Sequence, residues 1–589
     1  MDDAATQQRL ADACLALCGS ERAPLMLALV AARLGSIDGK TREIIIKKLR
    51  LVSSALSQAT RAALEVEFAC TMDNGRPPQD FALPSSTASR LLGSCSTMRR
   101  LSDCDSLWRR TCEFYHTKKA AAWTSGAVPF HISSSAFIAA HYASVIHGFI
   151  VESESRLHKR TTDICYIFDV GCGCGLLGVQ VARELKKLGM RGFCVVLADI
   201  DISAALAQIQ LSDASTLVSE GLVQVCRLDD SPDPHQATVE LLLLPSGAKL
   251  KTASRRPLVL LSNYLVDSLP VDIVRVCQGA RDEALTPLAA DGGETFAYRA
   301  LRSPLLFPEE SNMQTLFERL LERARRDGQK RRGGVGVALV PAGAARLFWW
   351  LNRLRHPQYP LLALVGDKIV DSDSLPKLVA ADREDRHERL LLSDLRLFDV
   401  HGSADGPVSC CVDADALVEV VRMCCPSREF ETRVLGRTPM MGDFDVVALS
   451  VLPKGHDFQQ TQAIFKEGLG TFGPADMERL HAFLQERDDV PMRTLNDLLR
   501  LARCDWASFV SLQRNLLQGF RRCTRKEALH ALRTIWRSYR RRIVLGPQEW
   551  KQSHRSFARF LRATRCWLPL SSRRRGSRSG HGSTSNIGT

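Results

Sequence analysis

The chain has 589 residues, of which 45% are hydrophobic and 24% are charged. At roughly 150 residues per domain this length predicts several folded units, and the apolar content excludes a chain that is disordered throughout. No apolar run reaches the roughly 18 to 20 residues that cross a bilayer, so no membrane span is expected. The N-terminus lacks the features of a secretory signal, and we therefore expect an intracellular protein, cytoplasmic or mitochondrial and not secreted.

The positive charge is concentrated at the C-terminal end. Residues 501–589 contain 20 Lys and Arg residues against three acids, whereas the whole chain carries a net charge of +14. The first 500 residues are therefore close to neutral, and the basic end is expected to bind a partner rather than to determine a reaction. The 19 cysteines include no C-x-x-C pair, so the sequence predicts reduced thiols and no metal site.

The spacing of apolar residues divides the chain into successive parts. Residues 1–120 have helical spacing. Residues 121–455 alternate short apolar runs with helices, which predicts an α/β fold with a doubly wound, Rossmann-like sheet. A charged segment at about 282–334 interrupts this rhythm and is interpreted as an insertion. Residues 456–570 again have only helical spacing, and the Ser, Gly and Arg-rich tail at 571–589 is predicted to be disordered.

The first expected strand, 165–170, runs directly into glycines at alternate positions and then into an amphipathic helix. This is the geometry in which backbone approaches a ligand closely and a helix N-terminus faces it. The spacing differs from the G-x-G-x-x-G of dinucleotide sites, and the preceding acid would repel a pyrophosphate but favour an ammonium group. The stretch resembles motif I of the class I S-adenosylmethionine-dependent methyltransferases. The resemblance implies that S-adenosyl-L-methionine is bound by Asp169, Gly171, Gly173 and Gly175.

Acids also follow the next two strands. Asp199 ends the expected strand that begins at 193, and an acid there can accept hydrogen bonds from both ribose hydroxyls; Asp201 is a further candidate. Asp229 follows the third strand, where family members place an acid near the adenine amino group. Singly, Asp199 could be a helix N-cap and Asp229 a turn residue. Their succession at consecutive strand ends favours a cofactor site.

The fourth expected strand, 258–262, breaks into a polar loop that contains the candidate catalytic residues Asn263, Tyr264 and Asp267. Here the chain resembles the MidA-like methyltransferases, the family of the mitochondrial complex I assembly factor, whose loop reads Asn-Glu-aromatic-x-Asp-x-Leu-Pro. Tyr264 stands where that family has a glutamate. The resemblance covers about 128–452, and its first part, 128–142, is similar to the helix that closes over the cofactor.

Methyl transfer from a sulfonium is a direct displacement, so the protein mainly aligns a nucleophile and handles a proton. An arginine acceptor would need carboxylates that fix its guanidinium. Asp267 could be one of them, but the family's second carboxylate, a glutamate, is replaced here by Tyr264. The pair Asn263-Tyr264 also resembles the Asn-Pro-Pro-Tyr loops that hold planar amides or amino groups, which leaves glutamine or a nucleobase open. Alternatively, Asn263 is a turn residue and Asp267 an N-cap.

The sequence therefore predicts a methyltransferase that acts on a protein side chain of the arginine or glutamine type. Two alternatives remain open: an RNA methyltransferase tethered by the basic end, and a catalytically silent assembly factor that retains the fold. In the basic end, residues 513–542 carry arginines on helical sequence, which predicts either a phosphate-contacting surface or a solvated helix face. Trp536 and Trp567 are expected to lie in the core rather than to stack on a ligand.

Overall fold

The computed structural model describes much of the chain after residue 99, and all described residues belong to one compact unit, Thr97–Thr589. The described ranges are 100–118, 133–157, 163–211, 214–228, 240–250, 255–277, 282–287, 295–301, 306–307, 310–331, 334–379, 390–391, 395–400, 407–424, 429–438, 444–540 and 547–565. The predicted N-terminal helices before residue 100, the basic tail and Asp229 lie outside them.

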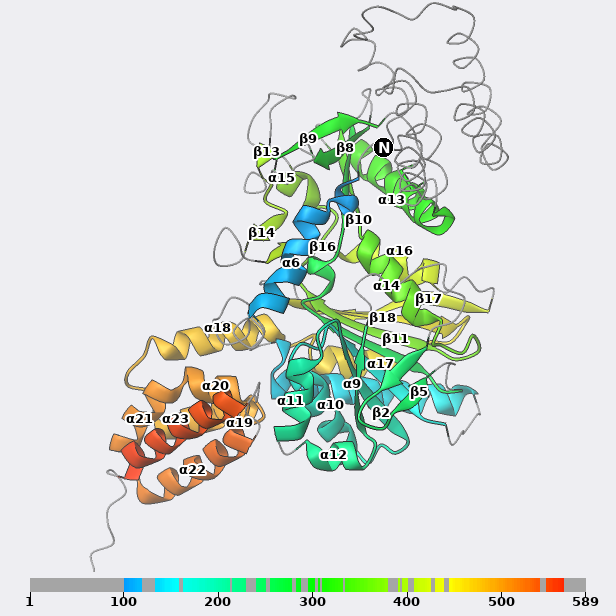
Figure 1. Cartoon of the computed structure of the whole chain (residues 1–589). Helices are drawn as coiled ribbons and strands as arrows, with labels where there is room; N and C mark the ends of the chain where they lie inside the picture. The colour runs from blue at the N-terminus through cyan, green and yellow to red at the C-terminus, as the bar shows by residue number, and fades with distance from the viewer. Residues whose placement is uncertain are drawn as a thin grey trace, which may run out of the picture. The chain divides into compact units, whose positions relative to one another are not determined.

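The central sheet has seven strands in the order β17-β18-β11-β6-β1-β2-β3 (Figure 1). Five of them run parallel: β1 (Cys165–Val170), β2 (Phe193–Asp199), β3 (Val223–Arg227), β6 (Leu258–Asn263) and β11 (Leu361–Asp367). Only β18 (Asp445–Pro453) runs against its neighbours, pairing with β11 and with β17 (Phe430–Arg437). The predicted α/β, doubly wound sheet is confirmed, and each predicted strand begins within one residue of its observed start.

Each face of this sheet is covered by helices. Alternate strand residues point to opposite faces, so Val195 and Leu197 of β2 join one core while Cys194 and Val196 join the other. The first core is completed by α9 (Ala136–Leu157), α10 (Leu176–Lys187), α11 (Ser203–Leu211), α12 (Ser215–Ser219) and α17 (Gln459–Glu467), and it continues into the C-terminal helices. The second is completed by α13 (Ser311–Gln329), α14 (Ala342–Asn352) and α16 (Ala414–Cys424). Because both faces are buried, the parallel strands are almost uniformly apolar.

A second, antiparallel sheet is formed largely by the chain between β6 and β11, in the order β10-β7-β8-β9-β13. Its strands are β7 (Asp272–Cys277), β8 (Glu283–Pro287), β9 (Thr295–Ala300), β10 (Val335–Val340) and β13 (Leu390–Leu391). Its core includes residues of η1 (Leu101–Asp103), α6 (Asp105–Lys118) and α15 (Leu375–Val379). The sequence predicted an insertion and its charged helix, which is α13, but it did not predict this sheet.

Short strand pairs complete the described architecture. β4 (Leu241–Leu243) pairs with β5 (Ala248–Leu250), β12 (Ile369–Val370) with β16 (Val412–Asp413), and β14 (Phe398–Val400) with β15 (Val408–Cys410). No helix within the described ranges is both long enough and apolar enough to cross a membrane.

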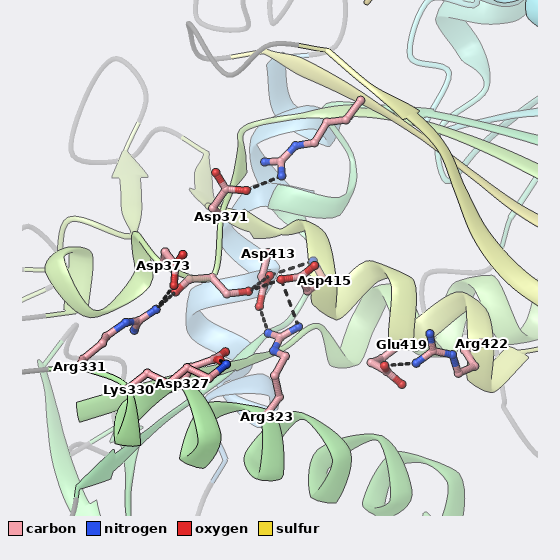
Figure 2. Close-up of polar contacts among 12 residues, drawn as sticks. Arg323, Asp327, Lys330, Arg331, Asp371, Asp373, Asp413, Asp415, Glu419 and Arg422 are labelled. Carbon is pink, nitrogen blue, oxygen red and sulfur yellow. Dashed lines mark hydrogen bonds and ion pairs between the residues drawn. The ribbon is translucent and has the colours of Figure 1, made fainter. Parts of the chain in front are cut away.

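An ion-pair network fixes the inserted helix α13 to the segments around β12 and β16 (Figure 2). Arg323 of α13 pairs with Asp413, whose side chain is fully buried, and lies 3.9 Å from Asp415. Ser372 Oγ lies within hydrogen-bond distance of both carboxylates, at 3.0 Å from Asp413 and 2.7 Å from Asp415, and its one hydrogen can be donated to either. Arg331, two residues beyond the end of α13, pairs with Asp373 at 2.5 Å, so the helix and the turn after it are each held by an ion pair.

The chain ends, within the described residues, in a group of helices. They are α18 (Pro474–Gln485), α19 (Met492–Leu501), α20 (Trp506–Ser511), α21 (Gln513–Arg522), α22 (Arg525–Arg540) and α23 (Pro547–Arg565). The buried carboxylate of Asp505 accepts hydrogen bonds from Ser508 N at 3.0 Å and from Ala136 N at 3.1 Å, and so caps both α20 and α9. The expectation for Trp536 was wrong, because its side chain is 52% exposed. Trp567 lies outside the described residues.

Candidate active site

The strand order reverses direction between β1 and β6, which makes the carboxyl ends of these two strands the topological switch point of the sheet. In open α/β sheets, ligands bind in the crevice outside the carboxyl ends of the strands at this point. The glycine-rich turn follows β1, and the loop with Asn263, Tyr264 and Asp267 follows β6. The fold therefore brings the two predicted motifs to the same edge of the sheet.

The turn after β1 needs its glycines for conformational reasons. Gly171, Gly173 and Gly175 have φ values of 68°, 54° and 70°, all in the left-handed region that side chains disfavour. The space beside the turn is also tight, because a Cβ on Gly171 would lie 3.0 Å from Leu265 Cδ1, and one on Gly175 would lie 2.7 Å from Leu197 Cδ1. Three alternate residues in this conformation bring bare backbone to the start of α10.

Asp169, at the end of β1, faces the first turn of α10. Gly178 N donates to Asp169 Oδ2 at 2.9 Å, so this carboxylate caps a helix whose N-cap residue, Gly175, has no side chain to do so. Asp169 is only 2% exposed, and burial raises its pKa to about 7, with the Gly178 hydrogen bond opposing and the charge of Asp199 adding to the rise. A neighbouring cation would favour its ionised form.

The two acids after β2 face different partners. Gly173 N donates to Asp199 Oδ2 at 2.7 Å, so this half-buried carboxylate lies directly on the glycine turn. Burial raises the pKa of Asp199, and hydrogen bonds from Gly173 and Asp201 oppose the rise. Asp201 instead accepts from Ser203 N at 2.9 Å, at the first residue of α11. Asp199 keeps lone pairs for a ligand, because each carboxylate oxygen accepts more than one hydrogen bond.

The cysteines of the turn are poor nucleophiles. Burial raises the pKa of Cys172 well above its usual value and that of Cys174 to about 11, with the charges of Asp199 and Asp169 contributing. Thiols at such values remain protonated near neutral pH. Across the described residues, no group of His, Cys, Asp and Glu side chains is arranged to hold a metal ion.

The amide of Asn263 connects the end of β6 to the helix that precedes β1. Tyr142 OH donates to Asn263 Oδ1 at 2.8 Å, and Asn263 Nδ2 donates to the carbonyl of Ser133 at 2.8 Å. Tyr142 belongs to α9 and is fully buried, and burial raises its pKa. Asn263 therefore positions α9 at the switch point.

Tyr264 has an unusual backbone and a packed ring. Its φ is 51°, in the left-handed region, and its N–H donates to the carbonyl of Gly366 at 2.8 Å. The ring lies 4.9 Å from that of Phe444 and packs against the core on the α9 side. A strained non-glycine residue at a loop is often retained at a functional site.

Asp267 lies in η2 (Val266–Ser268) beside a second buried acid, Asp367, which ends β11. The two residues are 3% and 0% exposed, and Asp267 N donates to Asp367 Oδ2 at 3.2 Å. Burial raises the pKa of both carboxyls; the charge of Asp267 raises that of Asp367 further, while Ser268 and Lys368 oppose the rise at Asp267. Two such groups share a proton more readily than they both ionise.

The helix α6 contributes a residue that the sequence did not single out. Burial raises the pKa of Tyr115, and the charges of Asp267, Asp199 and Asp367 add to this rise. Lys368 Nζ contacts Asp399 Oδ2 at 2.5 Å, and its charge also acts on Asp267. Asp367 could have been found, because it ends a buried apolar strand, β11, which pairs with β6. Tyr115 had no such signal.

The chain matches no protein-family model, and it matches no curated protein. Two solved structures from Burkholderia thailandensis are similar to it, each with 14% identity and a TM-score of 0.35. One is an uncharacterized COG1565 superfamily protein, with 62% of this chain and 91% of that chain covered. The other is a COG1565 superfamily member and "likely methyl transferase" bound to S-adenosyl-homocysteine, with 62% and 97% covered. At this level of similarity, functional inference rests on the residues of the switch point.

Proposed function

We propose that the chain is an S-adenosylmethionine-dependent methyltransferase that acts on a protein side chain of the arginine or glutamine type. The observation that carries this proposal is the turn after β1, where three left-handed glycines meet the carboxylate of Asp199 at the switch point. The sheet also differs from the all-parallel order 3-2-1-4-5-6 of dinucleotide folds, because an antiparallel strand, β18, follows β11.

The residues at the turn fit this cofactor. Asp199 has free acceptor capacity for ribose hydroxyls, and Asp169 offers a carboxylate whose ionised form a cationic ligand would stabilise. When bound, the cofactor supplies a methyl group on a sulfonium. Asp229 remains a proposed adenine contact. The resemblance to the MidA-like family supports the same assignment, and with it an intracellular place of action, cytoplasmic or mitochondrial.

The acceptor is proposed to meet the loop after β6. Tyr264 replaces a family glutamate, but Asp367 provides a second carboxylate beside Asp267. Two carboxyls can hold a guanidinium by paired, charge-assisted hydrogen bonds, or take the proton that a methylated nitrogen releases. Asn263 holds α9 over the site in this scheme. One contact favours the second candidate, a silent assembly factor. Tyr264, which replaces the family's glutamate, packs its ring against Phe444 on the core side and not toward an acceptor.

Binding of the cofactor is tested by calorimetry with S-adenosylmethionine. Wild type should bind, and Gly173→Arg should not, because an arginine would occupy the backbone cradle. Gly189→Arg is the matched control, since Gly189 also has a positive φ, 78°, but has no atom within 4 Å of an added Cβ. Failure of wild type to bind would contradict the proposal.

The acceptor class is tested by incubating the protein with tritiated S-adenosylmethionine and cell extract. The tritium label in macromolecules should be removed by protease and should resist ribonuclease. The Asp267→Asn and Asp367→Asn variants should transfer less label than wild type. Label removed by ribonuclease would favour the RNA methyltransferase. Cofactor binding without transfer to any macromolecule would favour the silent assembly factor.

A further inference from the structure

The last two described helices present an unusually basic surface. α22 and α23 each contain five Lys or Arg residues and one acid. Among the described residues, several exposed cations of these helices have no hydrogen bond or ion pair with any partner; they are Arg533, Arg537, Lys551, Arg555 and Arg559. Like charges gathered without counter-charges repel one another, and an anionic partner relieves that repulsion.

An exposed aromatic ring lies among these charges. Trp536 is 52% exposed and stacks on Tyr539, with ring centroids 5.4 Å apart and an interplanar angle of 27°. On a helix, residues three and four apart share a face, so Arg533 lies on the same face as Trp536, and Arg537 lies one turn after Arg533. Leu529, one turn further back, is 48% exposed.

The ring is held by a rigid support. Tyr539 stacks on Phe557 of α23 at 4.1 Å with an interplanar angle of 15°, and its hydroxyl contacts His554 Nδ1 at 2.6 Å. Trp536 also lies 6.0 Å from Phe557, so its indole contacts α23 as well as its own helix. Helices α22 and α23 lie side by side in Figure 1. The packed rings of Tyr539 and Phe557 therefore hold the indole in place, and little freedom is lost when a ligand stacks on it.

We propose that this α22–α23 surface binds single-stranded RNA. Guanidinium groups contact phosphates without reading sequence, and an exposed aromatic ring stacks on an unpaired base. An acidic protein would use the charges but would not need the indole, which favours nucleic acid over an acidic peptide. A duplex keeps its bases stacked inside and cannot use the indole in this way. The inference does not depend on methyl transfer, since none of these residues belongs to the switch point.

The test uses the full chain and a fluorescein-labelled twelve-residue oligouridylate, followed by fluorescence anisotropy at low and moderate salt. Wild type should bind, and affinity should fall steeply with salt. Trp536→Ala should weaken binding about tenfold or more, as the loss of one base stack does. Arg533→Ala with Arg537→Ala should weaken binding and reduce the salt slope by about two.

Two matched controls distinguish binding by the α22–α23 surface from the effect of removing any exposed ring or positive charge. Phe483→Ala removes an aromatic ring that is 52% exposed on α18, and Arg514→Ala removes an exposed cation that already pairs with Asp488 at 3.0 Å. Both variants should bind within about twofold of wild type. Thermal melts establish whether each variant is folded. Arg533 and Arg537 are exposed, so their double variant should stay folded and tests the surface even if Trp536→Ala unfolds.

Three results would overturn the proposal. The oligouridylate could fail to bind at low salt. It could bind wild type and both surface variants equally, which would assign binding to other basic residues of the chain. Finally, polyglutamate or duplex RNA could bind as tightly as the oligouridylate with no dependence on Trp536, which would identify an acidic protein or a shape-recognised duplex as the partner.

Discussion

Replacing Asp199 by asparagine separates ligand binding from support of the glycine turn. The asparagine Oδ1 can still accept the hydrogen bond that Gly173 N donates at 2.7 Å, and only the longer bond from Asp201 N, at 3.4 Å, loses its acceptor. Burial raises the pKa of Asp199, which means that its ionised form is disfavoured in the folded protein. The free energy of unfolding of Asp199→Asn should therefore equal that of wild type or exceed it.

Ligand affinity should respond in the opposite direction. A charge-assisted hydrogen bond is worth about 1.5 to 3 kcal/mol, and asparagine replaces one acceptor oxygen by a donor, so Kd should rise roughly 10- to 150-fold. Asp199→Ala also leaves Gly173 N unpaired, which should lower the free energy of unfolding by about 1 to 3 kcal/mol. Asp201→Asn is the matched control, because its carboxylate caps α11 and an asparagine can do the same.

Calorimetry with S-adenosylhomocysteine and urea unfolding measure the two quantities. If the Kd of Asp199→Asn for S-adenosylhomocysteine lies within threefold of the wild-type value, Asp199 does not bind the ligand and only supports the glycine turn. An equal loss of affinity in Asp201→Asn would refute the assignment of the ribose contact to Asp199.

Three further predictions concern stability. The folded-state pKa of Asp169 is about 7 against a usual 3.8, so wild type should lose stability as pH rises from 5 to 8, by about 2.7 kcal/mol relative to Asp169→Asn, in urea titrations at each pH. Gly171→Ala should be less stable than Gly189→Ala by differential scanning calorimetry; both strain a positive φ, but only the first crowds a neighbour, Leu265. Arg323→Ala strands the buried Asp413 and should cost about 3 kcal/mol in urea unfolding, whereas Arg326→Ala on the same helix should cost less than about 0.5 kcal/mol.

The central sheet was predictable because its signal is local. A strand buried on both faces is a short apolar run, and β1 was predicted with its observed bounds. The second sheet escaped prediction because most of its strands lack such runs; β10, which reads Val-Gly-Val-Ala-Leu-Val, is the exception. β9, for example, reads Thr-Phe-Ala-Tyr-Arg-Ala, and its partner β13 lies about ninety residues further along the chain. Pairing at that separation is set by tertiary packing rather than by local pattern.

The candidate residues at strand ends were singled out from the sequence. Those that come near the switch point only through tertiary packing were missed. The glycine turn and Asp199 come from local sequence, and they meet as the order of strands requires. Tyr115 lies on a helix remote in sequence and reaches the site only through tertiary packing. The position of Trp536 could have been predicted. Buried Ala531, Ile535 and Tyr539 recur every four residues on α22, and Trp536 falls one position outside that stripe.

The acids at the switch point together indicate the charge of the ligand. Asp199, Asp169 and Asp367 lie at or next to the carboxyl ends of three parallel strands, Asp267 follows a fourth, and burial raises the pKa of each. A pyrophosphate would add charge of the same sign and raise these pKa values further. A ligand with an ammonium and a sulfonium group would favour the ionised carboxylates and so bind with release of protons. Cofactor affinity should therefore increase with pH through the pKa of Asp169, and this distinguishes a cationic methyl donor from an anionic dinucleotide.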